Sequence, residues 1–134
     1  MNAHVTCGPL GDENVRGITA LAKSLHWPCY VVDLAGCDEK PALLQRIADN
    51  LMFPSWFGHN WDAFFDCLVD LAAARRASGC VIVLRNADAM RAHAPEALDT
   101  ALGILEDAAK VWERRGVAMR TFVDVEFPAA QPQP

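Results

Sequence analysis

The chain has 134 residues, of which 52% are hydrophobic and 22% are charged, and its formal net charge is −5. This composition is typical of one globular domain with a single core, and it excludes a disordered chain. No apolar run approaches the roughly 18 residues of a membrane span, and residues 1–15 lack the basic and apolar regions of a secretory signal, so we expect a cytoplasmic protein.

The first part of the chain predicts two helices and a strand. A helix is expected over residues 14–25, within an N-terminal extension of residues 1–27. The run CYVVDL at 29–34 is almost continuously apolar, as in a strand of a parallel sheet that is covered on both faces. Asp38 is expected to cap the next helix, which extends to Asn50. The apolar stripe of that helix consists of Leu43, Leu44, Ile47, Ala48 and Leu51.

Two further strands and a helix are predicted in the second part. Asn60 is a good cap for a helix that reaches about Ala73. The runs CVIVLR at 80–85 and VAMRTFVDV at 117–125 predict buried strands. Three strands separated by helices indicate a small α/β sheet with right-handed crossovers.

The longest predicted helix spans Pro95 to Arg115 and stops at Gly116. Its apolar face consists of Leu98, Ala101, Leu102, Leu105, Ala108 and Trp112. The Pro-rich residues 127–134 are expected to be a disordered tail.

The five cysteines stand at positions 7, 29, 37, 67 and 80, without a C-x-x-C pair. Their odd number and spacing fit neither a disulfide framework nor a metal finger. Cys29, Cys67 and Cys80 have apolar neighbours, so we expect them to behave as small core residues.

The negative charge is concentrated in one segment. No Lys or Arg lies between Arg46 and Arg75, an interval that contains Asp49, Asp62, Asp66 and Asp70. Such a patch repels phosphate backbones, so we expect no direct contact with nucleic acid and favour a basic partner.

The predicted helix from Asn60 places its aspartates on one side. At about 100° per residue, Asp62, Asp66 and Asp70 span about 80°, and Phe65 and Val69 border them. The core face consists of Ala63, Phe64, Cys67, Leu68 and Leu71. Asp62 favours the helix dipole, but Asp66 and Asp70 oppose it, and no Lys or Arg lies on this helix. A solvated face and a binding face both remain open, and the neighbouring aromatics favour binding.

The segment before this helix is rich in aromatic residues. Phe53 and Trp61 can fill gaps in the core, whereas Trp56 and Phe57, in a loop that ends at Gly58, are hard to bury completely. Such residues often anchor interfaces. Gly58 permits a turn or a close backbone approach. The next two residues, His59 and Asn60, offer polar contacts, although Asn60 is equally explained as the cap.

Together these residues resemble the signature of the barstar family of ribonuclease inhibitors. The matching positions are Pro54, Trp56, Phe57, Gly58, Asn60, Asp62, Ala63, Phe65, Asp66, Cys67 and Leu68. The similarity continues backward through ALLQRIADNL to YVVDLAG and covers residues 28–126. It implies a three-layer α/β fold with a three-stranded parallel sheet flanked by helices, preceded here by the helical extension. It also implies an intracellular inhibitor that blocks the active site of a secreted ribonuclease.

The resemblance also implies the site. Asp62 and Asp66 are the central carboxylates, and Asp66 faces the basic phosphate-binding residues of a basic secreted ribonuclease or related toxin. The complete set of expected partner-binding residues is Trp56, Phe57, Gly58, His59, Asn60, Asp62, Phe65, Asp66, Val69 and Asp70. We expect no catalytic residue, no metal and no cofactor, and we favour a monomer.

The chain departs from the family prototype around these acids. Two tyrosines of the prototype are Trp56 and Phe57 here, its helical tryptophan is Phe65, and a glutamate is His59. The Gly-Trp pair after its helix is Asp70-Leu71, and the glutamate on its last helix has no confident match. The altered residues leave open a regulatory or immunity module of the same fold with a partner that is not a ribonuclease.

A metal-dependent enzyme is the least favoured alternative. His59, Asp62 and Asp66 share one helical face, and such side chains can bind a divalent ion, but no second ligand cluster accompanies them. Nucleophilic catalysis has less support, because Cys67 is expected to point inward and His93 has no evident partner.

Overall fold

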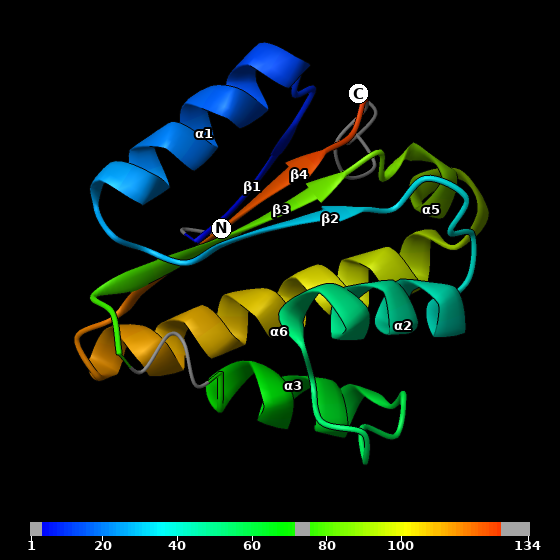
Figure 1. Cartoon of the computed structure of the whole chain (residues 1–134). Coiled ribbons are helices and arrows are strands. Elements are labelled where there is room, and N and C mark those ends of the chain that lie inside the picture. The colour runs from blue at the N-terminus through cyan, green and yellow to red at the C-terminus, as the bar shows by residue number, and fades with distance from the viewer. Residues whose placement is uncertain (1–3, 72–75, 127–134) are drawn as a thin grey trace, which may run out of the picture.

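The computed structural model describes residues 4–71 and 76–126. Within them, four strands form one parallel sheet in the order β1-β4-β3-β2 (Figure 1). The strands are β1 (Val5–Gly8), β2 (Cys29–Asp33), β3 (Gly79–Arg85) and β4 (Ala118–Asp124). In the interior strand β3 every residue except Arg85 is buried, as its continuous apolar run predicts for a strand covered on both faces.

The prediction of three strands is wrong, because β1 adds a fourth at the edge of the sheet beside β4. Its register runs from Val5 opposite Thr121 to Gly8 opposite Asp124. The sequence of β1, VTCG, is too short and too mixed in polarity to stand out as a buried strand. Part of the N-terminal extension therefore completes the sheet.

A buried polar contact fixes the start of β1. The backbone N–H of His4 donates to Glu106 Oε1 at 2.9 Å, and its imidazole Nδ1 contacts Glu106 Oε2. The other imidazole nitrogen lies 3.3 Å from Glu113 Oε2. Burial raises the pKa of Glu106, but the hydrogen bonds from His4 outweigh burial and leave the pKa below its usual value.

Helices cover both faces of the sheet. Helix α1 (Asp12–Ser24) lies on one face and packs Val15 and Ala22 against Val81 and Val83. Helices α2 (Lys40–Leu51) and α6 (Pro95–Arg114) lie on the opposite face, and α3 (Trp61–Val69) packs against α6 on the side away from the sheet (Figure 1). The candidate helix α3 is therefore the outermost element of this half of the molecule.

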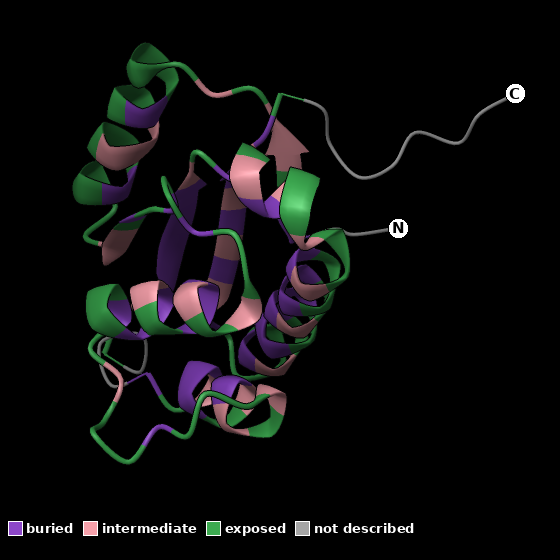
Figure 2. Cartoon of the chain, turned by 90° about the vertical axis from the view of Figure 1, so that its right-hand side faces the viewer, coloured by how far each residue is buried: buried purple, intermediate pink, exposed green. Residues whose placement is uncertain are grey.

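The core contains the predicted apolar stripes. All five stripe residues of α2 and all six of α6 are buried. Figure 2 shows the buried residues of these helices on their inward sides and the exposed residues on their outer sides. Cys67 and Cys80 are buried as expected, and burial raises the pKa of Cys80 to about 12, whereas Cys29 is half-buried.

The structure corrects several predicted boundaries. Helix α1 begins two residues before position 14, at Asp12. The prediction of Asp38 as a cap is wrong: Glu39 is the N-cap of α2, and its side chain makes no capping hydrogen bond. Pro41 in the first turn has no N–H, so one of the donors that a cap would satisfy is absent.

Two further differences concern helix ends and short helices. Helix α3 ends at Val69, with Asp70 as its C-cap, and does not continue toward residue 73. A short helix, α5 (Asp88–His93), occurs in a stretch for which no element is predicted. By contrast, α6 ends where expected, and Gly116 beyond it has a φ of 83°.

No helix in residues 4–71 and 76–126 is long and apolar enough to cross a bilayer. The predicted disordered tail at 127–134 lies outside the described residues.

Candidate functional site

The loop between α2 and α3 is held by aromatic packing beneath it. The Phe57 N–H donates to the Pro54 carbonyl at 3.0 Å, which closes a turn. The rings of Phe53 and Phe57 meet edge to face at 5.2 Å, and Phe53 also packs 6.2 Å from Phe64 of α3. These contacts fix the loop against the helix that follows it.

Trp56 and Phe57 have opposite environments. The expectation that Phe57 is hard to bury is wrong: its side chain is 7% exposed and packs against Phe53 and His59. The burial of Phe57 leaves its neighbour pointing outward, and Trp56 is 66% exposed. A single indole is therefore the aromatic group that this turn presents to solvent.

The junction before α3 has a constrained backbone. His59 has a φ of 54°, and its Nε2 contacts the Gln45 side chain of α2. A Cβ at Gly58 would lie 3.1 Å from the side-chain Nδ2 of Asn60, so the absence of a side chain at Gly58 lets Asn60 approach the backbone closely. Asn60 is the N-cap, as predicted, and its Oδ1 accepts a hydrogen bond from the Ala63 N–H at 2.8 Å.

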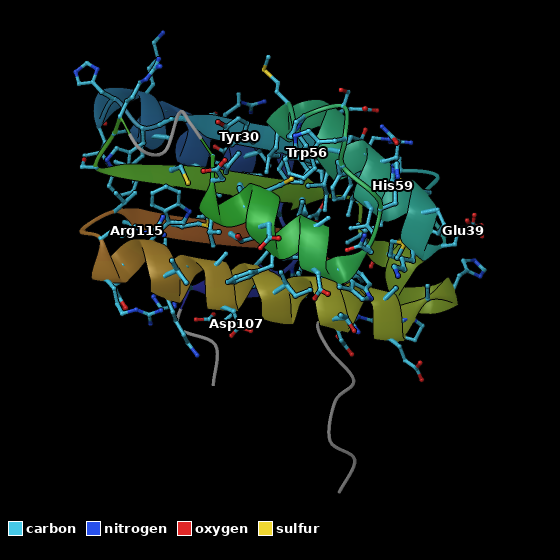
Figure 3. The ribbon with its side chains drawn as sticks, turned by 90° about the horizontal axis from the view of Figure 1, so that it is seen from below. Tyr30, Glu39, Trp56, His59, Asp107 and Arg115 are labelled. Carbon is cyan, nitrogen blue, oxygen red and sulfur yellow. The ribbon has the colours of Figure 1, made fainter. Side chains whose placement is uncertain are left out.

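The faces of α3 agree with the predicted helical arrangement. Phe64, Cys67 and Leu68 are buried. Asp62, Asp66 and Asp70 are exposed, and Phe65 and Val69 are half-buried beside them. We call Asp62, Phe65, Asp66, Val69 and Asp70 the acidic ridge. Figure 3 shows this side of the molecule, with α3 in front and Trp56 and His59 beside it.

Two acids of the ridge have no partner within the described residues. Neither Asp62 nor Asp66 makes a hydrogen bond or an ion pair within residues 4–71 and 76–126. Burial, followed by the charge of Asp66, raises the pKa of the Cys67 thiol, which is therefore held neutral beneath the ridge. Asp62 and Asp66 thus present unpaired carboxylates over an apolar base.

The C-terminal end of α3 is held by α6. The Trp112 indole donates to the Leu68 carbonyl at 2.9 Å, and Arg115 Nη1 donates to the Val69 carbonyl at 3.1 Å. The Arg115 guanidinium also lies 5.0 Å from the centre of the Trp112 ring. Arg115, the C-cap residue of α6, thus places a cation at the C-terminal end of α3, where it offsets the unfavourable position of the acids near that end.

Comparison with known families decides the kinship of the chain. A family model described as Barstar (barnase inhibitor) matches residues 27–124, well over half of the chain. The protein belongs to the barstar family. A comparison with curated proteins gave no match. The match starts after β1 and α1, so these two elements lie outside the matched residues.

In this barstar-family protein, α6 contributes an acid that sequence reasoning missed. Asp107 lines an open groove of about 580 Å³ between α3 and α6, together with Trp61, Asp62, Phe65, Asp66 and Ile104. Asp107 is exposed and is labelled in Figure 3 on the α6 side of α3. Its distance of more than forty positions from Asp66 in the sequence hides this proximity, and a helical projection of α3 alone cannot reveal it.

The structure does not assemble the alternative metal site. Within the described ranges, no group of three or more His, Cys, Asp or Glu side chains is placed to hold a metal ion. His59 instead contacts Gln45, whose amide nitrogen donates to Asp49 at 2.6 Å. The residues brought together in the barstar-like site are therefore acids and aromatics on α3, the loop before it and α6.

Proposed function

We propose that this protein inhibits a ribonuclease by inserting the acidic ridge of α3 and the loop of residues 52–60, which we call the Trp56 loop, into the basic active site of the enzyme. The observation that carries this proposal is the environment of Asp66. Its carboxylate is exposed and makes no hydrogen bond or ion pair within the described residues, although it stands among half-buried apolar side chains. A group in this state gains most from a partner that supplies cations.

The chemistry of the ridge matches the chemistry of a phosphate-binding site. Ribonucleases hold phosphates with Arg, Lys and His side chains, and carboxylates form charge-assisted hydrogen bonds with the same groups. In this proposal Asp66 binds the central cations, and Asp62 binds those at the N-terminal side. Phe65, Val69 and Trp56 exclude water around these bonds, which strengthens them.

The hydrogen bonds that hold both ends of α3 favour tight binding. Asn60 caps the N-terminal end of the helix, and Trp112 and Arg115 bind the carbonyls at its C-terminal end. A helix that is fixed at both ends loses little conformational freedom when it binds. The remaining expected contacts, Gly58 and His59 at the junction and Asp70 at the helix end, lie at the edges of this surface.

The experiment compares Asp66→Ala with Asp49→Ala, which removes an equal charge from an exposed position on α2. Inhibition and calorimetric affinity are measured with barnase and other small basic microbial ribonucleases. We expect Asp66→Ala to lose at least about 2 kcal/mol of binding free energy and Asp49→Ala much less. Equal losses in the two variants would remove Asp66 as the anchoring residue.

Stability supplies an independent measurement on the same variants. Asp66 repels Asp62 one turn away and opposes the helix dipole, so Asp66→Ala should raise the free energy of unfolding by about 0.2–0.5 kcal/mol. A gain in stability with a loss of affinity identifies a binding residue, whereas a gain in stability alone identifies a solvated face. Capture of a different protein by the same ridge, without inhibition of any ribonuclease, would favour the regulatory-module alternative.

A further inference from the structure

A hollow of about 500 Å³ lies next to the acidic ridge, between the end of α2, the Trp56 loop, the end of α3 and β2. Within the described residues it is lined by Tyr30, Leu51, Met52, Phe53, Pro54, Trp56, Cys67, Asp70, Leu71 and Arg76. Six of these ten are leucine, methionine, phenylalanine, proline or tryptophan side chains. Figure 3 shows Tyr30 and Trp56 together on the side of α3 opposite Asp107.

Two large apolar side chains at the rim of this hollow are mostly exposed to solvent. Met52 is 84% exposed and Trp56 is 66% exposed, the two highest values among the large hydrophobic residues that the structure describes. Both belong to the same hollow. Isolated exposed apolar residues are ordinary, but two large ones around an apolar depression mark a surface that other molecules contact.

The backbone holds Met52 in an unusual conformation at this rim. As the C-cap of α2, it has φ 58° and ψ 46°, in the left-handed region that glycine normally occupies at helix ends. A methionine here carries a conformational cost that glycine or asparagine would avoid. Its flexible thioether chain can adapt to differently shaped apolar groups, which suits a contact surface.

Leu71 forms part of the wall where the family prototype has tryptophan. Leu71 is buried and lines the hollow. A side chain as large as tryptophan at this position would take up part of the space, so the smaller leucine contributes to the opening.

We propose that this hollow receives an apolar, preferably aromatic, side chain of the protein partner. The inference rests on the proposed function, because a partner that covers Asp66 is continuous with the hollow through Trp56 and Asp70, which belong to both surfaces. Asp70 and Arg76 at its edge carry opposite charges, so the lining favours no net charge in the occupant. Tyr30, Phe53 and Trp56 offer rings against which an aromatic group packs well.

The first test uses p-cresol, which imitates a tyrosine side chain, and follows the backbone and methyl NMR signals of the full-length protein during titration. We expect saturable shifts at Met52, Phe53, Trp56 and Leu71. Absence of saturable shifts at these residues would overturn the proposal, whether or not the protein inhibits a ribonuclease.

The second test measures ribonuclease binding by Met52→Asn. Asparagine tolerates the left-handed backbone, so this variant removes the apolar rim without disturbing the end of α2. The matched control is Leu21→Asn, because Leu21 is 62% exposed on α1, on the other face of the sheet. We expect Met52→Asn to weaken binding about tenfold and Leu21→Asn less than about twofold.

The two tests separate the failure of this inference from the failure of the proposed function. If wild type inhibits a ribonuclease but Met52→Asn binds it as tightly as Leu21→Asn does, the hollow is not part of the interface and the inference is wrong. If wild type inhibits no ribonuclease in the panel, the proposed function is wrong, and the hollow does not receive a side chain of a ribonuclease. Shifts with p-cresol together with a selective loss in Met52→Asn support both.

Discussion

The indole nitrogen of Trp112 donates a buried hydrogen bond of 2.9 Å to the carbonyl oxygen of Leu68, and this bond joins the last turn of α3 to the side of α6. The carbonyl belongs to the group of helix-end acceptors that have no partner within their own helix. Because Leu68 is buried, no water satisfies its carbonyl in the absence of the indole. The position of the acidic ridge is thus set by a residue that does not belong to it.

Removal of this bond should destabilise the protein. Trp112→Phe keeps an aromatic ring in the core but leaves the Leu68 carbonyl without its donor, which costs about 1–3 kcal/mol of unfolding free energy. Urea denaturation measures the loss. Amide hydrogen exchange should accelerate in α3 more than in α2, because the bond acts on the end of α3.

Trp27→Phe is the matched control for Trp112→Phe. The Trp27 indole also donates a hydrogen bond of 2.9 Å, to Ser78 Oγ, but at an exposed position where water can replace it. Its loss should therefore cost less than that of Trp112→Phe. A similar cost for both variants would show that the burial of the Leu68 carbonyl contributes little.

Ionic strength should control the rate at which the protein meets the proposed ribonuclease. Asp62, Asp66 and Asp107 face one groove, and charges of one sign attract a basic partner over a distance that salt shortens. We expect the association rate constant to fall as salt rises from about 0.01 M to 0.15 M, where the screening length drops from about 30 Å to 8 Å. Stopped-flow tryptophan fluorescence provides the measurement, because Trp56 is exposed and lies in the proposed interface.

Asp107→Asn tests whether α6 contributes to this attraction. Its association rate should depend less steeply on salt than that of wild type. The control is Asp99→Asn, an exposed acid of α6 that pairs with Arg91 at 2.9 Å and does not line the groove. Identical salt dependence in wild type and Asp107→Asn would exclude a role for Asp107 in encounter.

Acid should weaken the attachment of β1 through Glu106. The hydrogen bonds of His4 hold the folded-state pKa of Glu106 below its usual value of 4.5. A lowered folded-state pKa gives stability that is present above the unfolded-state pKa and is lost as pH falls through the folded-state value. Wild type should therefore be more stable than Glu106→Gln at pH 7, and the difference should shrink as the pH falls below about 4.5.

Chemical denaturation of both proteins across this pH range measures the difference directly. Other carboxylates contribute equally to the unfolding free energies of the two proteins at each pH. The difference between these free energies therefore reports on Glu106 and the groups around it, which are His4, Glu113 and Lys110. A difference that stays constant from pH 7 to the acid range would contradict this prediction.

Trp27 should make Gly79 intolerant of any side chain. A Cβ at Gly79 would lie 2.5 Å from Trp27 Cδ2 and 2.6 Å from Cζ2, and the hydrogen bond to Ser78 fixes the indole. Gly79→Ala should therefore cost about 1–3 kcal/mol. Gly103→Ala is the control, because a Cβ on this exposed position of α6 meets nothing within 4 Å and should gain about 0.5–1 kcal/mol in helix stability. The midpoint temperature of thermal unfolding should therefore fall for Gly79→Ala and rise for Gly103→Ala.

The sequence predicts much of the fold because periodicity and apolar runs are local signals. The burial of β3, the stripe of α6 and the Asn60 cap all follow from neighbouring residues, and each is confirmed. The exposure of Asp62, Asp66 and Asp70 follows in the same way from helical spacing. Membership of the barstar family can also be recognised from the sequence, because the family motif lies within one short segment.

The tertiary structure decided the features that depend on contacts between residues far apart in the sequence. Four residues of β1 become a strand because β4 offers them a free edge, and their own sequence carries too little apolar surface to predict it. Phe57 is buried because Phe53 and His59 pack against its ring, whereas Trp56 is exposed, and the sequence of two adjacent aromatics does not reveal which one is buried. Asp107 joins the acids of α3, and Arg115 binds the end of that helix, because α6 packs beside it. Local sequence determined which side of α3 carries charge, whereas packing determined where the helix ends and which groups surround it.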